Sequence, residues 1–303
     1  MKLEFNELTL ESRHEIEPFF KLRDIISCEY NFNVMYLWAK HNQTKYAFTD
    51  NFLILTEVIE DKLITLMPIC KEEHFKEAFE AIYEYFQDIN TEFRMYVADK
   101  TFKEFIIKEY GDRFEISTYR DYFDYLYDAD KLRTLSGKKF NKKRNHLNAF
   151  IKEFEGRFIY KKLNKEDKEA VCKFLREWKY NKEAVTEALD EELQSICKII
   201  CNIDDLDIKA GAIVLDDKIQ AISIGSLTNN GKVAVIHVEK ANENIRGMYQ
   251  VINQQFLLNE FPNVEIVNRE EDLGIEGLRK SKLSYNPIEI LEKYSIIDRN
   301  FNQ

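Results

Sequence analysis

The sequence predicts an α/β fold built from two domains of similar layout. Its 303 residues are about twice the ~150 residues of a common domain. Each half contains a meander of short strands, followed by an amphipathic helix and a further strand. Corresponding strands are 30 residues apart in both halves, from Leu66 to Tyr96 and from Ile236 to Ile266, at an offset of 170. We therefore expect a duplicated architecture with mixed sheets flanked by helices.

In the first half, two short aromatic-rich helices are expected within 15–40. Alternating apolar residues predict antiparallel strands at 46–48, 52–59 and 62–69. A helix follows, because apolar residues recur at helical spacing at Phe75, Ala78, Phe79, Ile82, Phe86 and Ile89. The remaining elements are a strand at 93–98, a helix at 101–110 and a strand region at 114–127.

In the second half, a strand at 157–163 precedes two amphipathic helices carrying Val171 to Trp178 and Leu189 to Ile200. The elements expected after them are strands at 210–215, 219–227 and 232–239, a helix at 245–260, a strand at 264–267, a helix at 274–283 and a strand at 288–295.

A basic segment separates the halves. Residues 131–152 contain eight Lys or Arg and no acidic residue. We expect domains at 1–130 and 153–303, with 131–152 as a connecting helix. Cations at the start of a helix are unfavourable unless an anion lies nearby. Either a solvated face or an anion site explains this run. The candidate anion-binding or tRNA-binding residues are Lys138, Lys139, Lys142, Lys143 and Arg144.

Composition limits the functional classes. The net charge of −10 argues against general duplex DNA binding. Five cysteines, with no Cys-x-x-Cys and no signal-peptide pattern, predict reduced thiols in a cytoplasmic protein. No apolar run reaches the ~18 residues of a membrane span. No cysteine or histidine spacing typical of a metal site occurs, so no metal is expected.

The helix start at Arg246, Gly247, Met248 and Tyr249 is a candidate anion or substrate site. A helix N-terminus offers free N–H groups and a positive dipole end. Gly247 would let a ligand approach the backbone. An ordinary helix start is the alternative interpretation.

Two strand ends provide further candidates. His237 and Glu239 share a strand, and either could act as a general base; a structural histidine is the alternative. The segment 267–287 places dense charge after a strand, where α/β proteins bind ligands; a solvated loop is the alternative. Its candidate substrate-binding residues are Asn268, Arg269, Glu270 and Asp272.

Common catalytic motifs are absent. The run Ser136-Gly137-Lys138-Lys139 is not a Walker A loop, because Leu132 replaces the first glycine and Lys139 the Ser/Thr. No nucleophile elbow, zinc-protease or dinucleotide-binding motif occurs.

Three segments, 137–150, 245–253 and 267–287, resemble an uncharacterised bacterial family related to the C-terminal domain of phosphatidylglycerol lysyltransferase. The third, VNREEDLGIEGLRKSKLSYNP, is the most specific. The resemblance implies two tandem GNAT-like (acyl-CoA N-acyltransferase) folds, as in the Fem aminoacyltransferases.

The resemblance also implies transfer of an acyl or aminoacyl group to a small-molecule or peptide acceptor through its amine or hydroxyl. The donor would be an aminoacyl-tRNA, with tRNA as partner, or a coenzyme A thioester. On the basis of its chemistry alone, Tyr285 is the candidate that would protonate the leaving group. The usual coenzyme A motif, Arg/Gln-x-x-Gly-x-Gly/Ala, keeps only its middle glycine, Gly247, since Asn244 and Tyr249 replace the ends. An acetyl-CoA-dependent N-acetyltransferase and a non-catalytic binding or regulatory protein are the alternatives.

Overall fold

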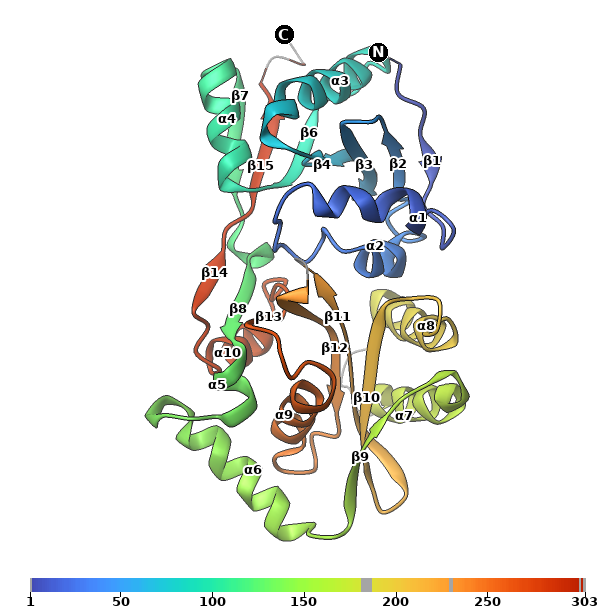
Figure 1. Ribbon diagram of the computed structural model, residues 1–303, viewed down its shortest axis with the longest axis vertical. Coiled ribbons are helices and arrows are strands. Elements are labelled where there is room, and N and C mark those ends of the chain that lie inside the picture. The colour runs from blue at the N-terminus through green and yellow to red at the C-terminus, as the bar shows by residue number, and fades with distance from the viewer. Residues whose placement is uncertain (1, 181–186, 229–230, 300, 302–303) are drawn as a thin grey trace. The chain divides into compact units, whose positions relative to one another are not determined.

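The computed structural model describes residues 2–180, 187–228, 231–299 and 301. It forms two compact units, each built on one mixed sheet (Figure 1). The first unit comprises 1–124, 271–276 and 290–303, and the second comprises 125–270 and 277–289.

The sheet of the first unit has the strand order β1-β2-β3-β4-β6-β15-β7, with β5 paired to β3. Its strands are β1 (Asn6–Glu7), β2 (Lys45–Phe48), β3 (Phe52–Ile59), β4 (Lys62–Leu66), β5 (Ile69–Cys70), β6 (Arg94–Ala98), β7 (Phe114–Thr118) and β15 (Tyr294–Asp298). Its α-helices are α1 (Arg13–Ile16), α2 (Phe32–Trp38), α3 (Phe75–Asp88) and α4 (Lys100–Tyr110). The predicted stripe of α3 is buried from Phe75 to Phe86, where the Phe79 ring meets those of Phe93 and Phe114, but Ile89 follows the helix end and is exposed.

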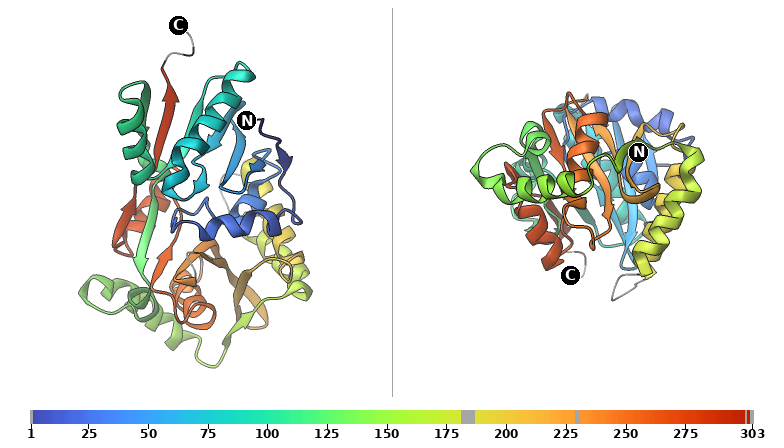
Figure 2. Two further views of the ribbon diagram at one scale, coloured as in Figure 1. Left: turned by 45° about the horizontal axis from the view of Figure 1, so that its top comes forward. Right: turned by 90° about the horizontal axis from the view of Figure 1, so that it is seen from below.

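The sheet of the second unit has the order β14-β8-β13-β12-β11-β10-β9. Its strands are β8 (Asp124–Asp128), β9 (Phe158–Lys162), β10 (Ile208–Leu215), β11 (Lys218–Thr228), β12 (Val233–Ala241), β13 (Ile266–Asn268) and β14 (Glu289–Leu291). Its α-helices are α5 (Ala129–Thr134), α6 (Asn141–Glu153), α7 (Lys168–Tyr180), α8 (Glu187–Cys201), α9 (Met248–Glu260) and α10 (Glu276–Leu283). Helix α9 packs on β10–β12, and α5 and α6 pack on α9; both views of Figure 2 show the green α6 beside the orange α9.

The two sheets share one plan. In each, a meander leads through a helix to a parallel strand, an antiparallel strand pairs with that strand, and one more strand forms the edge of the sheet. Leu66 pairs with Tyr96 across parallel β4 and β6, and Val233 pairs with Ile266 across parallel β12 and β13. The expected architecture, two GNAT-like folds in tandem with mixed sheets flanked by helices, is therefore present.

The units exchange strands, which differs from the expected division at 131–152. Strand β8, from the first half of the sequence, lies in the sheet of the second unit. Strand β15, from the end of the chain, lies between β6 and β7 in the first. The basic segment 131–152 belongs to the second unit. Alternating apolar residues identify a strand and leave its partner undefined, so the contiguous boundaries 1–130 and 153–303 do not match these units.

The cysteines correct one expectation. Cys172 of α7 and Cys197 of α8 form a disulfide rather than remaining reduced. The two helices pack against each other, which brings these sulfurs together. Cys28 and Cys70 are buried thiols, whereas Cys201 is exposed. Within the described ranges, no helix is long and apolar enough to cross a membrane.

Candidate functional site

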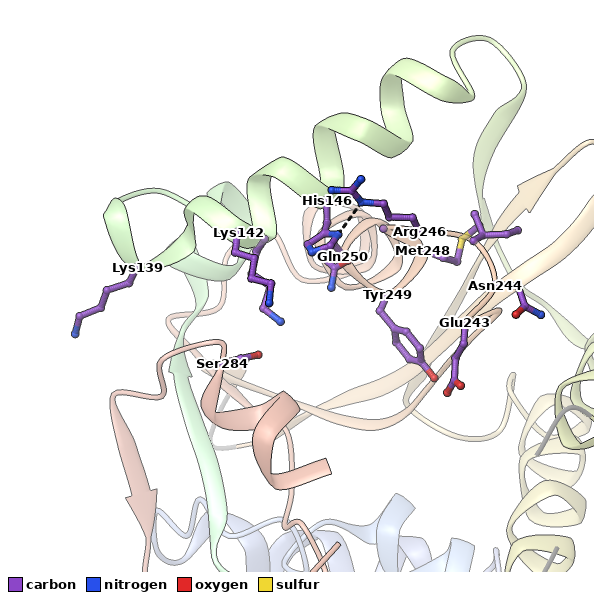
Figure 3. A pocket seen from close by; sticks show the side chains of 13 residues that line it. Lys139, Lys142, His146, Glu243, Asn244, Arg246, Met248, Tyr249, Gln250 and Ser284 are labelled. Carbon is purple, nitrogen blue, oxygen red and sulfur yellow. Dashed lines mark hydrogen bonds between the residues drawn. The ribbon is translucent and has the colours of Figure 1, made fainter. Parts of the chain in front are cut away.

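A pocket of about 680 Å³ lies in the second unit, where α6 meets the start of α9 (Figure 3). We call it the basic pocket. Its lining residues are Lys139, Lys142, Lys143, His146, Glu243, Asn244, Ile245, Arg246, Gly247, Met248, Tyr249, Gln250 and Ser284. The structure thus brings together two predicted anion-binding segments that are about a hundred residues apart in sequence, the basic run and the helix start at Arg246.

Helix α6 is anchored by its apolar side chains and presents its cations to the pocket. Leu147 and Phe150 are its buried residues. Lys142, Lys143 and His146 line the pocket. In Figure 3, the side chain of Lys139 points away from the other labelled groups.

Two predicted cations have other positions. Lys138 does not line the pocket. The Arg144 guanidinium donates to the Gly137 carbonyl at 2.8 Å and also to the Leu135 carbonyl. Arg144 therefore stabilises the turn that precedes α6 and does not point into the pocket.

Gly247 has a structural role that differs from the expected one. Its φ is +88°, in the left-handed region. A Cβ at this position would lie 2.4 Å from the His146 carbonyl oxygen and 3.0 Å from Phe150 Cβ. Glycine is needed here because the backbone of α6 approaches closely, so the space expected for a ligand is taken by helix packing.

Positive groups dominate the pocket. Arg246 Nε donates to His146 Nδ1 at 3.2 Å, which requires a neutral acceptor nitrogen on the imidazole (Figure 3). Burial and the neighbouring cations, Arg246 first among them, lower the pKa of His146. Among the lining residues Glu243 is the one carboxylate. The pocket is therefore suited to an anion.

Tyr285 does not line the pocket but contacts two residues that do, Gln250 and Lys143. Its hydroxyl accepts a hydrogen bond from Gln250 Nε2 at 3.3 Å, and Lys143 Nζ lies 3.9 Å from its ring centroid. The side chain is buried, and burial raises the pKa of Tyr285 to about 12. Tyr285 is thus a protonated phenol one hydrogen bond from a pocket residue.

An ion pair lies deeper, where β12 and β13 diverge. Their pairing ends at Val235 and Asn268, although β12 continues to Ala241. Arg269 Nη2 lies 2.8 Å from Glu239 Oε1, and the two side chains are 10% and 9% exposed. Asn253 Nδ2 donates to the other Glu239 oxygen at 3.0 Å. The pair joins the diverging strands, and neither Glu239 nor Arg269 lines the basic pocket.

His237 is held on both sides. Its side chain is 2% exposed; Nδ1 lies 2.9 Å from Glu270 Oε1, and Nε2 lies 2.7 Å from Ser226 Oγ. Burial lowers the pKa of His237 to about 3. It occupies an irregular position in β12, since Ile236 pairs with Gly225 and Val238 with Ile224. This geometry fits the structural alternative better than the general base, and His237 does not line the pocket.

The other predicted residues of 268–272, Asn268 and Asp272, form hydrogen bonds and ion pairs with nearby protein groups. Buried Asn268 accepts from the Glu270 N–H at 2.7 Å. In the first unit, the buried Asp272 lies 3.4 Å from Arg120 Nη1 and accepts from Gly274 N–H at 2.9 Å. Neither residue lines the basic pocket.

The lining residues that sequence reasoning missed as site candidates are His146, Glu243, Asn244, Ile245, Gln250 and Ser284. One of them carried a usable signal. His146 lies four residues after Lys142 in α6, the spacing that places side chains on one side of a helix.

Comparisons with known proteins agree with this architecture. A conserved protein of unknown function from Bacteroides thetaiotaomicron is 30% identical, with a TM-score of 0.93 over 98% of this chain and 100% of that chain. The structure of L-PGS from Bacillus licheniformis gives a TM-score of 0.66 at 14% identity, over 95% and 92% of the two chains. A tandem GNAT protein from the clavulanic acid biosynthesis pathway gives 0.52 at 8% identity, over 98% and 99%.

The family comparison covers nearly the whole chain. Residues 20–297 match the family model described as phosphatidylglycerol lysyltransferase, C-terminal. The match includes the basic pocket, Tyr285 and the ion pair between Glu239 and Arg269. The chain therefore belongs to the family of phosphatidylglycerol lysyltransferase C-terminal domains.

Proposed function

We propose that the protein transfers an acyl or aminoacyl group from a phosphate-bearing donor to the amine or hydroxyl of a small-molecule or peptide acceptor. The observation that carries the proposal is the convergence of Lys142, Lys143 and Arg246 in one pocket. Two of these cations lie in the first turn of α6, where the helix dipole opposes them. A bound phosphate would offset the unfavourable interaction of each lysine with the helix dipole.

The donor we favour is an aminoacyl-tRNA, whose acceptor end would lie in the basic pocket. Coenzyme A fits less well. The GNAT pattern presents a glycine-rich backbone to the pyrophosphate, whereas here α6 packs on Gly247. Flexible lysine and arginine side chains take over as the anion-binding groups, an arrangement that suits a polyanion such as RNA.

Tyr285 is the predicted catalytic residue with the best access to this donor. A phenol whose pKa is about 12 stays protonated at neutral pH, so it can supply a proton to the leaving oxygen. Gln250 links its hydroxyl to the pocket wall. The roles of His237 and Glu239 as bases have weaker support, because both are buried and hydrogen-bonded.

Fluorescence anisotropy with labelled bulk tRNA at low salt tests the donor. Wild type should bind, and the double variant Lys142→Met/Arg246→Met should not. Lys152→Met is the matched control, because Lys152 is an exposed lysine of α6 that does not line the pocket. Absence of wild-type binding, or equal binding by the double variant, would reject tRNA as the donor in this pocket. Isothermal titration with acetyl-CoA tests the alternative donor, for which we expect no binding.

A further inference from the structure

We propose that Lys143 is a modification site: its ε-amine is acylated by acyl phosphates that bind in the basic pocket. The proposal uses the pocket of the proposed function and requires no acceptor and no tRNA. The ligand class is small and defined, an acyl group joined to a phosphate.

Lys143 is a partly buried cation in the wall of the basic pocket. Its Nζ lies 3.9 Å from the Tyr285 ring centroid, and the Arg269 guanidinium carbon lies 4.9 Å from the same centroid. Arg269 is paired with Glu239. Within the part of the chain that the structure describes, no carboxylate forms an ion pair with Lys143. A lysine in such surroundings is more easily deprotonated than a solvated one.

Burial and the neighbouring charges also favour the neutral form of the Lys143 amine. Burial first, then the positive charges of Arg269 and Lys142, lower the pKa of Lys143 to about 8, and Glu239 opposes the shift. At pH 8 about half of such amines are neutral, against roughly 0.4% for a lysine with the reference pKa near 10.4. Desolvation beside another cation is a recognised way to produce a nucleophilic lysine.

The rest of the pocket supplies the phosphate site. Lys142 and Arg246 line it together with Lys143. Arg246 is oriented by its hydrogen bond to His146 (Figure 3). A phosphate held by Lys142 and Arg246 would bring the attached carbonyl carbon to the amine of Lys143.

The chemical step is an aminolysis. The neutral amine nitrogen attacks the acyl carbon, and the bond between that carbon and the bridging phosphate oxygen breaks. Inorganic phosphate leaves with the bonding electron pair, and the nitrogen loses one proton to solvent. The product is a neutral amide, so the pocket loses one positive charge and binds anions more weakly.

The neighbouring lysines provide internal controls. Lys142 is exposed in the same pocket, and Lys152 is exposed on the same helix outside it. Both should react at the rate of ordinary surface amines. The selectivity can therefore be measured on the wild-type protein, with no variant whose folding is in question.

The experiment treats the full chain with acetyl phosphate at pH 8 and follows each lysine by peptide mass spectrometry. We expect Lys143 to react about 10-fold faster than Lys142 and Lys152, a factor that allows for its lower basicity. Pyrophosphate should slow Lys143 and leave Lys152 unchanged. Arg246→Met should also slow Lys143 with acetyl phosphate, but not with N-acetoxysuccinimide, which carries no phosphate.

Two results would overturn the inference. One is acetylation of Lys143 at the rate of Lys142 or slower. The other is selectivity that pyrophosphate and Arg246→Met do not change, which would mean that no phosphate site directs the reaction. Either result can occur while tRNA still binds, so the proposed function would survive it. Conversely, selective and competable acetylation without tRNA binding would retain this inference and reject the tRNA donor.

Discussion

The second unit contains two strongly charged regions with opposite organisation. Around Arg269 and Glu270, the charges are largely shielded from solvent and paired: Arg269 with Glu239, and Glu270 with His237. Even Lys282, 7% exposed, donates to the carbonyls of Arg269 and Glu270. In the basic pocket, Lys142, Lys143 and Arg246 line the cavity, and within the described residues none of them forms a salt bridge. The comparison shows that a high density of charged residues is typical of both a structural polar core and a binding surface. The two are distinguished by whether the charged side chains form salt bridges with one another.

The largest expected effect is a loss of stability when the buried ion pair between Arg269 and Glu239 is removed. Arg269→Met should lower the free energy of unfolding by about 3–5 kcal/mol, because it leaves the Glu239 carboxylate buried without its cation. Urea unfolding followed by circular dichroism measures it. Arg246→Met, in the pocket, should change stability by less than ~0.5 kcal/mol. Equal losses in the two variants would remove the distinction between the regions.

The second effect concerns the pocket alone. Lys142→Met/Arg246→Met should weaken tRNA binding about 100-fold and make the logarithm of the binding constant fall less steeply with the logarithm of salt concentration. Anisotropy titrations at several salt concentrations measure both quantities. An unchanged salt dependence would mean that these side chains do not contact phosphates.

The third effect tests why Gly247 is needed. Gly247→Ala should destabilise by about 2 kcal/mol, because its φ is positive and the new Cβ meets the His146 carbonyl. Gly277→Ala is the matched control, since Gly277 has no atom within 4 Å of an added Cβ and lies in α10. That change should stabilise by roughly 0.5–1 kcal/mol. A neutral Gly247→Ala would contradict the close packing of α6 on this turn.

The smallest effect is the pH response of the buried histidine. The folded-state pKa of His237, about 3, lies below its unfolded value near 6.5, so its contribution to stability is complete above pH 6.5 and declines as the pH falls toward 3. We expect a loss of about 1 kcal/mol between pH 6.5 and 5.5. His237→Gln should be less stable at pH 7 and lack this component of the slope. Urea unfolding at pH 7.0, 6.5, 6.0 and 5.5 measures it; parallel slopes would contradict the assignment.

Sequence periodicity predicted most elements of the fold. The apolar stripe of α3 and the spacing of the parallel pairs depend on local pattern and layout. The structure confirms the stripe from Phe75 to Phe86 and the 30-residue separation of Leu66 and Tyr96. In the second sheet the paired residues are farther apart in sequence than expected, since Ile266 pairs with Val233 and not with Ile236. The exchange of β8 and β15 was not predictable, because a strand pattern does not name its partner. The Cys172–Cys197 pairing likewise depends on helix packing.

The residues of the candidate site were likewise predictable from sequence, whereas their arrangement in space was not. The cations of α6 and Arg246 were predicted singly, from charge and helix position, but their convergence depends on α6 crossing the start of α9. The segment 267–287 is predicted to bind a ligand because its charges are dense. Sequence does not reveal that Glu239 pairs with Arg269 or that His237 contacts Glu270. Nor does it reveal that Lys282 hydrogen-bonds the backbone carbonyls of Arg269 and Glu270.

The position of β15 has a consequence for synthesis on the ribosome. Strands β6 and β7 are separated in their sheet by residues 294–298, which are translated about 200 residues after β6 and about 180 after β7. Until those residues emerge, β6 and β7 each expose an edge without its neighbour. The first unit to be translated is thus the last to complete its sheet, and a nascent chain that lacks β15 exposes two strand edges able to pair with other chains.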